Sequence, residues 1–422
     1  MTSPVEPSDH RLWVLSELYY PEMTSTGYFL SMIAEGMAER YRVGVICGQP
    51  SYSARGTKSP GFEVHNGVEI HRCTATTLDK NVPLFKVLNI VTVSLSLFFT
   101  SLRRLRRGDI ALVVTNPPLL PFLTAVAAKF KGARTVLLVH DVYPEVLVAS
   151  EMAGANSLLT RAVKWMTGHL YQAVDRVISI GRDMERLVLA KLPSGAENNG
   201  SGKSVVITNW GEPEDITPMP KSENELLRRL GLADKFVVQY AGNIGRSHAI
   251  EELLETARLL RDDPYFHFLF IGTGARRAFL QQGVKKLGLE NVTVLDPLPR
   301  DQRPVALGAC DISIISFKPG MSGVSVPSRM YNVFASGRPL LGVCEDDSEL
   351  AMTLREWQVG WVVAPRNPSA IVDTLRAAAS NPAEVSAMGR RARETALSVF
   401  RFPTIKESYF RLMDSLFHRT SD

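Results

Sequence analysis

The sequence is poor in cysteine and has no long basic array, and each shortage excludes a class of protein. Its 422 residues include only four cysteines, at positions 47, 73, 310 and 344, without the spacing of a metal site. We therefore expect free thiols in a reducing cytosol and no bound metal ion. Because no run of lysine and arginine alternates with aromatic residues, we expect no nucleic-acid partner.

An apolar signal region is also missing. The first eleven residues, MTSPVEPSDHR, are polar, so we expect a cytoplasmic rather than an exported protein. The length is too great for one hydrophobic core and suggests two or three domains. A net charge of +5 is mildly basic and favours an anionic substrate or surface.

One stretch without charge could contact a membrane. Residues 87–102 carry no charged side chain, and arginines follow at positions 103, 104, 106 and 107. This run is shorter than the ~20 apolar residues that a membrane span requires. We expect the segment 83–107 to form a helix that lies on an anionic membrane surface, with its arginines at the head groups. The alternative is a core helix with a solvated basic end.

Strand-like apolar runs alternate with helical patterns along the chain, as βαβ units require. The first half has a predicted helix over Gly27–Glu39 and predicted strands at Trp13–Leu18, Val43–Cys47, Ile110–Thr115, Arg134–Val139 and Arg176–Ile180. A predicted loop at Leu192–Ser204 and a crossing from Thr208 to Pro220 lead to strands at Phe236–Tyr240, Phe266–Ile271 and Asp311–Phe317. We predict an α/β protein with two doubly wound domains, residues 1–210 and 211–400, facing a central cleft. Residues 401–422 are expected to form a helix that packs back on the first domain.

Three strand–glycine–helix joints follow one another in the second half. They are Gly242-Asn243-Ile244-Gly245, Gly272-Thr273-Gly274 and the segment Gly320–Asn332. Ligands of open parallel sheets bind beyond the carboxyl ends of the strands, where these joints lie. A single glycine pair is often a tight turn without a ligand, but three in one domain favour a binding site.

The third joint has the composition of a phosphate site. Pro327 suits the first position of a helix, and the small residues before it, Ser322 to Ser325, can form an anion nest. Arg329 stands in the first helical turn, where a cation is disfavoured unless an anion is present. We predict that this site holds a mobile diphosphate, as a sugar nucleotide carries. Arg246 is a second candidate cation, and its alternative is a solvated surface arginine.

Two polar sites are predicted in the first half. His140 and Asp141 end a strand, where His140 could contact a transferred sugar and Asp141 could orient His140 or accept a proton. The alternative is a helix-capping aspartate beside a structural histidine. Gly27, after Thr24–Thr26, could approach the diphosphate or an acceptor, or could belong to a well-capped helix without a ligand.

With these residues identified, the chain resembles the retaining GT-B glycosyltransferases of family 4. Within them it is most similar to bacterial polysaccharide enzymes of the colanic-acid and O-antigen fucosamine transferase type. The resemblance extends over nearly the whole chain and depends on Tyr20-Pro21-Glu22, Asp141-Val142-Tyr143-Pro144-Glu145, Asn209-Trp210, Tyr240–Gly245, Gly272-Thr273-Gly274, Pro327-Ser328-Arg329 and Ala335–Pro339. It implies two Rossmann-like domains, a nucleotide sugar held mainly by the second, no obligatory metal or other cofactor, and retention at the anomeric carbon.

The resemblance also assigns individual roles. By match, Gly242, Asn243 and Gly245 line the diphosphate, Arg329 neutralises it, and Ser322, Gly323, Val324 and Ser325 supply backbone N–H groups. Gly272 and Thr273 border the base, and His140 or Asp141 faces the sugar. The chain departs from the family at its Glu-x7-Glu pair, where it has Val324 and Asn332. Asn332 can still bind a ribose hydroxyl, and Glu345 or Ser348 with Glu349 are alternative ribose contacts.

We therefore expect transfer of a sugar, of N-acetylhexosamine type, from a UDP-sugar to a lipid-linked or polysaccharide acceptor. The enzyme would work in the cytoplasm, peripherally on the inner face of the membrane. Two alternatives remain open. One is an enzyme of the UDP-N-acetylglucosamine 2-epimerase type, which would consume donor without an acceptor. The other is a non-catalytic scaffold at the membrane.

Overall fold

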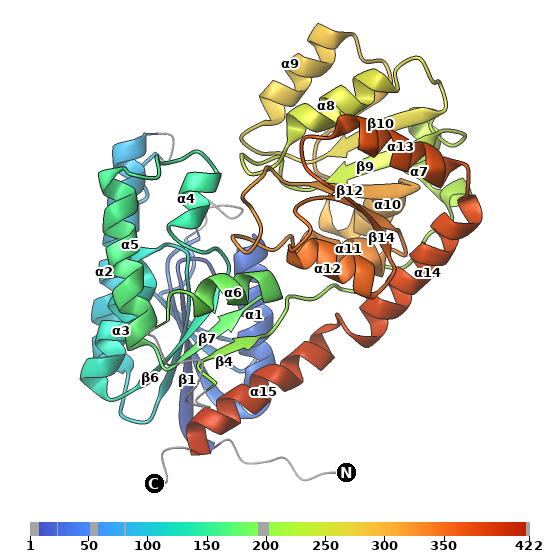
Figure 1. The fold of residues 1–422 in the computed structure, drawn as a ribbon. Helices are drawn as coiled ribbons and strands as arrows, with labels where there is room; N and C mark the ends of the chain where they lie inside the picture. Colours follow the sequence, from blue (N-terminus) through green and yellow to red (C-terminus); the bar gives the residue numbers. More distant parts are fainter. Residues whose placement is uncertain (1–7, 23, 51–57, 80–81, 193–201, 419–422) are drawn as a thin grey trace, which may run out of the picture.

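The chain folds into two α/β domains, one built on a mainly parallel sheet and the other on a parallel sheet, with helices on both faces of each (Figure 1). The computed structural model describes residues 8–22, 24–50, 58–79, 82–192 and 202–418. The expectation of two doubly wound domains is confirmed. The predicted domain boundaries at 210 and 400 fall in connecting segments outside both sheets. Their exact positions stay predictions.

The first sheet has the strand order β3-β4-β2-β1-β5-β6-β7-β8, parallel except for the β3–β4 pair. Its strands are β1 Ser8–Ser16, β2 Tyr41–Cys47, β3 Phe62–His65, β4 Val68–Arg72, β5 Ile110–Val114, β6 Arg134–Val139, β7 Arg176–Ser179 and β8 Ser204–Val206. The helices are α1 Ser25–Met37, α2 Pro83–Arg104, α3 Leu119–Lys131, α4 Glu145–Ala149, α5 Leu158–Ala173 and α6 Arg182–Leu189. Every residue of β5 is buried, which explains why its sequence is continuously apolar.

The second sheet has the order β11-β10-β9-β12-β13-β14 and is parallel throughout. Its strands are β9 Phe236–Ala241, β10 Phe266–Ile271, β11 Val292–Leu295, β12 Ile312–Ser316, β13 Leu340–Val343 and β14 Gly360–Val363. Its helices are α7 Glu225–Leu230, α8 Ile250–Leu259, α9 Arg277–Leu287, α10 Arg303–Gly308, α11 Arg329–Ala335, α12 Glu349–Glu356, α13 Pro368–Ala379 and α14 Pro382–Ser398. The three predicted strands of this half are β9, β10 and β12.

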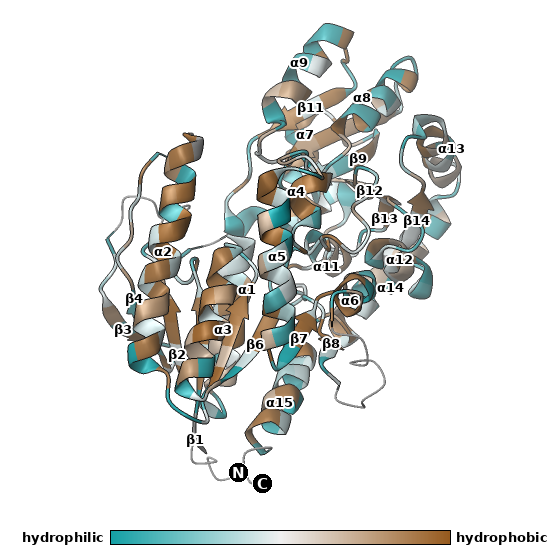
Figure 2. Cartoon of the chain, turned by 60° about the vertical axis from the view of Figure 1, so that its left-hand side comes forward, coloured by the Kyte–Doolittle hydropathy of each residue, from teal (hydrophilic) through white to brown (hydrophobic). Residues whose placement is uncertain are grey.

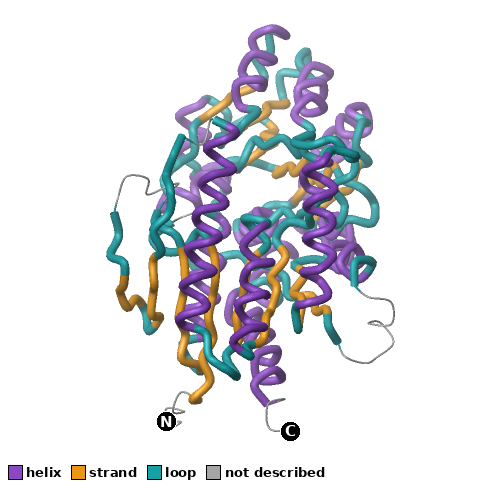
Figure 3. Tube along the Cα trace, turned by 90° about the vertical axis from the view of Figure 1, so that its left-hand side faces the viewer, coloured by secondary structure: helices purple, strands orange, loops and turns teal. Residues whose placement is uncertain are grey.

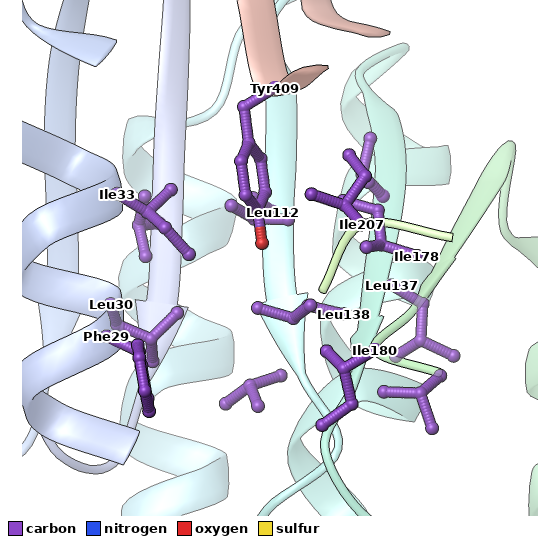
Figure 4. Close-up of a cluster of buried hydrophobic side chains, with 14 of the residues drawn as sticks. Phe29, Leu30, Ile33, Leu112, Leu137, Leu138, Ile178, Ile180, Ile207 and Tyr409 are labelled. Atoms are coloured by element: carbon purple, nitrogen blue, oxygen red, sulfur yellow. The ribbon is translucent and has the colours of Figure 1, made fainter. Parts of the chain in front are cut away.

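Helix α15, Phe402–His418, leaves the second domain and runs back along the first (Figure 1). Its buried Tyr409 points into the core that Leu30 and Ile33 of α1 share with Leu112 and Leu138 of the first sheet (Figure 4). Its outer residues also pair with the first domain, because Arg40 Nη1 lies 2.7 Å from Asp414 Oδ2 and Lys406 Nζ lies 2.6 Å from Glu39 Oε1. The last helix is therefore part of the first domain's core.

The two chain crossings between the domains lie against each other. Gly211 donates its N–H to the carbonyl oxygen of Phe400 at 2.9 Å, and Gly211 forms a parallel bridge with Arg401. A Cβ on Gly211 would lie 2.5 Å from the carbonyl oxygen of Tyr331. The crossing near residue 211 is thus packed directly on α11, which carries Arg329.

Some local predictions differ from the structure. The predicted loop Leu192–Ser204 ends in a strand, because Ser204 begins β8, while residues 193–201 lie outside the described residues. The polar N-terminal segment also lies largely outside them. Helix α2 begins at Pro83, as expected, and ends at Arg104, three residues before the expected end at residue 107.

Helix α2 packs beside α3, which in turn lies beside α5, on one face of the first sheet (Figure 3). Within the described part of the chain, residues 84–104 make up one helix long and apolar enough to cross a membrane by length and composition. Its inner side buries Asn89, Ser94 and Ser101, and Asn89 Nδ2 donates to the carbonyl oxygen of Leu78 at 2.9 Å. These three polar residues of the run are therefore directed into the domain.

Candidate active site

The two domains meet through the segment that follows β6. Val142 donates its N–H to the carbonyl oxygen of Val324 at 3.0 Å, and Asp141 forms an isolated antiparallel bridge with Ser325. The predicted sugar-facing pair of the first domain therefore lies beside the predicted phosphate turn of the second. The sequence could place each at a strand end, but only the fold brings them into contact.

His140 and Asp141 are held by Thr115, whose hydroxyl oxygen accepts both of their N–H groups at 3.2 and 3.3 Å. Burial lowers the pKa of His140 to about 4, so its imidazole is neutral at pH 7. Its Nε2 is buried and has no hydrogen-bond partner among the described residues. Burial also raises the pKa of the Asp141 carboxyl, and a hydrogen bond with the Ser325 side chain partly opposes that rise.

Arg329 is the first residue of α11 and lies over the ring of Tyr240, with Cζ 4.3 Å from the ring centroid. Its Nε and Nη2 atoms are buried and have no hydrogen-bond partner in the described part of the chain. The helix begins two residues after Pro327, which was predicted as its first residue. With seven residues α11 is short, so charge at this site comes mainly from the guanidinium.

The glycines of the first two joints allow two loops to pack backbone against backbone. A Cβ on Gly272 would lie 1.9 Å from the carbonyl oxygen of Gly242, and Gly272 has a φ of +156° that side chains rarely adopt. The N–H of Ile244 donates to the carbonyl oxygen of Thr273 at 2.8 Å. Arg329 lies directly on this pair of loops, because a Cβ on Gly242 would be 3.2 Å from its Nη1.

Most N–H groups of the predicted nest already have partners within the protein. Gly320 and Ser322 donate to the carboxylate of Glu345 at 2.9 and 2.8 Å, and Gly323 donates to Asp183 Oδ2 at 2.8 Å. The N–H of Val324 donates to the carbonyl oxygen of Met321 at 3.1 Å. The expectation that Ser322, Gly323 and Val324 offer N–H groups to a diphosphate is therefore not met in this conformation.

The ribose candidates are similarly engaged. Asn332 Oδ1 accepts the N–H of Glu212 at 3.0 Å, so Asn332 anchors the crossing near residue 211. Ser348 caps α12, and Glu349 pairs with Arg182, with Oε1 3.0 Å from Nη2. Val324, at the other Glu position of the family pair, is buried in the core.

The remaining predicted residues surround the same region. Gly27 lies in the first turn of α1, where a Cβ would be 2.7 Å from the carbonyl oxygen of Glu22. Its neighbour Ser25 has its hydroxyl 3.4 Å from that of Ser328, so α1 reaches the turn before Arg329. Asn243 and Thr273 are exposed, and the N–H of Gly245 donates to His248 Nδ1 at 3.1 Å.

Arg246 is exposed and borders a cavity of about 220 Å³ between the domains, together with Arg276, Lys318 and Glu151. Lys318 pairs with Glu151 across the domains at 2.9 Å, and Arg276 pairs with Glu251 at 2.5 Å. A second cavity of about 560 Å³ lies between α4, α5 and the turn; it is lined mainly by apolar residues, and its polar side chains are Glu145, Thr160, Lys164 and Ser322. Both cavities open beside the predicted site.

Sequence reasoning missed the pair Arg182 and Asp183 on α6. Asp183 Oδ2 accepts N–H groups from Gly323 and Glu349 of the other domain, each at 2.8 Å. The available signal was a polar pair shortly after a buried strand, here separated from β7 by Ile180 and Gly181. No cluster of three metal-ligating side chains occurs in the ranges that the structure describes. Independence from metal stays a prediction.

Family models match both halves of the chain. Residues 26–198 match a glycosyl transferase 4-like domain, and residues 222–395 match the glycosyl transferases group 1. The chain is 34% identical to the probable glycosyltransferase WbjE of Pseudomonas aeruginosa over 64% of its length, and spans 65% of that relative. It is 26% identical to the putative colanic acid biosynthesis glycosyl transferase WcaI of Escherichia coli, over 85% of this chain and 90% of the relative.

Solved structures show the same fold. Sucrose-phosphate synthase from Thermosynechococcus elongatus superposes with a TM-score of 0.76 at 16% identity, over 97% of this chain and all of that one. Anabaena HepE in complex with UDP-glucose superposes with a TM-score of 0.70 at 16% identity, over 96% and 99% of the two chains. The predicted GT-B fold is confirmed, and the first domain matches the glycosyl transferase 4-like domain while the second matches the glycosyl transferases group 1.

Proposed function

We propose that this protein is a retaining glycosyltransferase that moves an N-acetylhexosamine-type sugar from UDP to a lipid-linked or polysaccharide acceptor. The observation that carries the proposal is Arg329, whose two partnerless buried nitrogens lie beside the Gly242 loop. A buried donor without a partner costs roughly 1–3 kcal/mol, which an anionic ligand would recover. UDP is favoured because HepE, which shares this fold, is solved with UDP-glucose.

In this proposal the donor diphosphate is gripped mainly by a side chain. Arg329 supplies a full positive charge, while the N–H groups of Gly320, Ser322 and Gly323 remain bonded to Glu345 and Asp183. Of the residues in the predicted nest, Ser325 is the one that pairs with Asp141 of the first domain. Gly242, Asn243 and Gly245 would line the diphosphate, and Gly272 and Thr273 the base. Glu345 would be freed for ribose only if the turn rearranges, and the Asn332 oxygen only if it releases the N–H of Glu212.

The first domain would bind the transferred sugar. A neutral His140 can exchange a hydrogen bond with a sugar hydroxyl through its partnerless Nε2. The acceptor oxygen would attack the anomeric carbon on the face from which the diphosphate leaves. The bond from that carbon to the phosphate oxygen breaks, and the departing phosphate takes the acceptor's proton. Arg329 would stabilise the charge that develops on the leaving group.

The acceptor would reach this site from the membrane side of the first domain. Exposed apolar residues occur on three neighbouring helices, α2, α3 and α5, and α2 is mostly apolar, with polar residues interspersed (Figure 2). We call this surface the apolar face and define it by Leu84, Val87, Leu88, Leu95, Phe99, Phe130, Leu158, Leu159 and Trp165. Exposed arginines at the end of α2 flank it, as an anionic bilayer would require. The cavity lined by Lys164 and Thr160 opens beside α5.

The experiment is a thermal-shift screen of nucleotides and nucleotide sugars. The true donor, at 100 times its dissociation constant, should stabilise the protein by about 2.7 kcal/mol. NMR of the donor with and without candidate acceptors then separates the alternatives. Transfer with retained anomeric configuration supports the proposal, conversion of the donor alone indicates an epimerase, and no stabilisation by any nucleotide indicates a scaffold.

A further inference from the structure

The carboxylate of Asp183 links the first domain to the turn that precedes Arg329. Asp183 lies in the first turn of α6 and is 4% exposed. One of its oxygens accepts the N–H groups of Gly323 and Glu349, and the other accepts the N–H of Met184 at 2.6 Å. A single buried oxygen of the first domain thus satisfies two backbone donors of the second.

The same turn has a second anchor within its own domain. Glu345 Oε1 accepts the N–H of Gly320, and its Oε2 accepts the N–H of Ser322. The turn is therefore held between two carboxylates, one of them from the opposite domain. Three residues after Ser322 comes Ser325, which pairs with Asp141, and Arg329 follows four residues later. Displacement of the turn would move both.

Other contacts of α6 also bring it close to the second domain, and we call this contact between α6, Val326 and α12 the α6 junction. A Cβ on Gly181 would lie 2.7 Å from Val326 Cγ2 and 3.1 Å from Glu349 Cβ, so glycine permits the approach of the two domains. The guanidinium of Arg182 forms a fork on Glu349, with Nε to Oε2 at 3.1 Å and Nη2 to Oε1 at 3.0 Å. Its Nη1 also pairs with Glu356 at 2.6 Å, on the exposed rim.

We propose that Asp183 is a positioning residue that couples the arrangement of the two domains to the shape of the turn before Arg329, residues 320–328, which we call the donor turn. The proposal rests on the proposed function for its effect on the donor, but the coupling itself is a property of the fold. If the domains separate, the N–H groups of Gly323 and Glu349 lose their shared acceptor. Because coupling between binding and conformation is reciprocal, a ligand at the donor turn should also stabilise the α6 junction.

The test compares Asp183→Asn with Glu356→Gln. Asp183→Asn removes the charge and leaves one acceptor oxygen, so the side chain can no longer accept the N–H of Met184 on one side and those of Gly323 and Glu349 on the other. Glu356→Gln changes the same junction at a side chain that is 47% exposed and does not contact the turn. Hydrogen–deuterium exchange of residues 318–328 should accelerate in Asp183→Asn and stay unchanged in Glu356→Gln. UDP affinity, measured by calorimetry, should fall about tenfold in the first variant, or about 1.4 kcal/mol.

The outcomes separate the two proposals. Unchanged exchange in Asp183→Asn overturns the coupling. Faster exchange with unaltered UDP affinity reduces Asp183 to a structural role and also overturns the inference. If wild-type protein binds no UDP while exchange accelerates, the coupling stands and the proposed donor is wrong. Should Asp183→Asn fail to fold, Asp183→Glu keeps the charge but shifts it by one methylene, and the same two readouts apply.

Discussion

At the scale of single residues, the site is marked by buried polar atoms that lack partners. His140 Nε2 and two guanidinium nitrogens of Arg329 are in this state among the described residues, on opposite sides of the domain junction. Buried atoms without partners also occur away from the junction, for example Ser94 Oγ and Thr124 Oγ1, so it is the position of His140 and Arg329 beside the bridge between Asp141 and Ser325 that favours a ligand site. The lowered pKa of His140 can be tested without knowing the substrate, because it affects how the free energy of unfolding depends on pH.

The buried His140 should make stability depend on pH. Its pKa is about 4 in the folded chain and near 6.5 when unfolded, so unfolding takes up a proton between these values. The full stability is present above pH 6.5 and is lost as pH falls toward 4. We expect the unfolding free energy of wild type to fall more steeply over this window than that of His140→Gln, by up to about 1.4 kcal/mol per pH unit.

Urea unfolding between pH 7 and pH 4 measures this difference. Asp141, whose pKa is raised by burial, acts in the opposite direction and remains present in both proteins, so the comparison isolates His140. His169→Gln, at an exposed position on α5, should behave like wild type. Equal slopes for wild type and His140→Gln would show that the imidazole is not buried in neutral form.

At the scale of elements, α2 presents the clearest unpartnered surface. Its Phe99 is 54% exposed, so a charged residue there should cost little stability. We expect the protein to sediment with vesicles that contain phosphatidylglycerol. Phe99→Glu should weaken this binding by about tenfold, because burial of a phenylalanine side chain contributes about 1.5–3 kcal/mol.

Tyr265→Glu is the matched control for the vesicle experiment, since Tyr265 is an exposed aromatic residue of the second domain. It should bind vesicles as wild type does. If Phe99→Glu sediments with vesicles to the same extent as wild type, α2 does not contact the membrane. If wild type does not bind anionic vesicles, the apolar face is not a membrane-binding surface.

The elements that the sequence predicts well are long, apolar and followed by glycine. β9, β10 and β12 combine a buried run with a strand–glycine–helix joint, which is a local signal. β3 was missed because Phe62 and Val64 are exposed and its burial alternates on a four-residue strand. Similarly, β8 is three partly buried residues and follows a polar loop. Short edge strands owe their structure to pairing, and pairing is absent from the local sequence.

Residue types at the site were predictable, but their partners were not. Arg329 and His140 stood out by position and chemistry. The use of the turn's N–H groups by Glu345 and Asp183 depends on how β13 and α6 approach that turn. Such contacts join residues 23 to 140 positions apart, and no local pattern encodes them. The interdomain role of Asp183 is therefore a result of the fold.

At the scale of the whole molecule, α15 follows the second domain along the chain and completes the core of the first. Tyr409 is buried in the first domain's core although its helix follows the second domain (Figure 4). Tyr409→Ala should lower the unfolding free energy by about 3–5 kcal/mol, as large-to-small core changes do. The exposed Glu407 on the same helix provides the control, and Glu407→Ala should change stability by less than about 0.5 kcal/mol.

Calorimetry of these two variants checks the prediction. A large fall in the melting temperature of the first domain for Tyr409→Ala, without one for Glu407→Ala, is expected. Equal melting temperatures would mean that α15 is dispensable to the first core.

The central claim is that Arg329 neutralises the leaving diphosphate, and turnover of the identified donor by Arg329→Ala tests it most directly. Loss of one charge-stabilising donor group typically costs ~10²–10³-fold in rate, and we expect a fall of that size. Arg246→Ala, at an exposed position in the neighbouring cavity, should lose much less. Turnover of Arg329→Ala close to that of wild type would contradict the account.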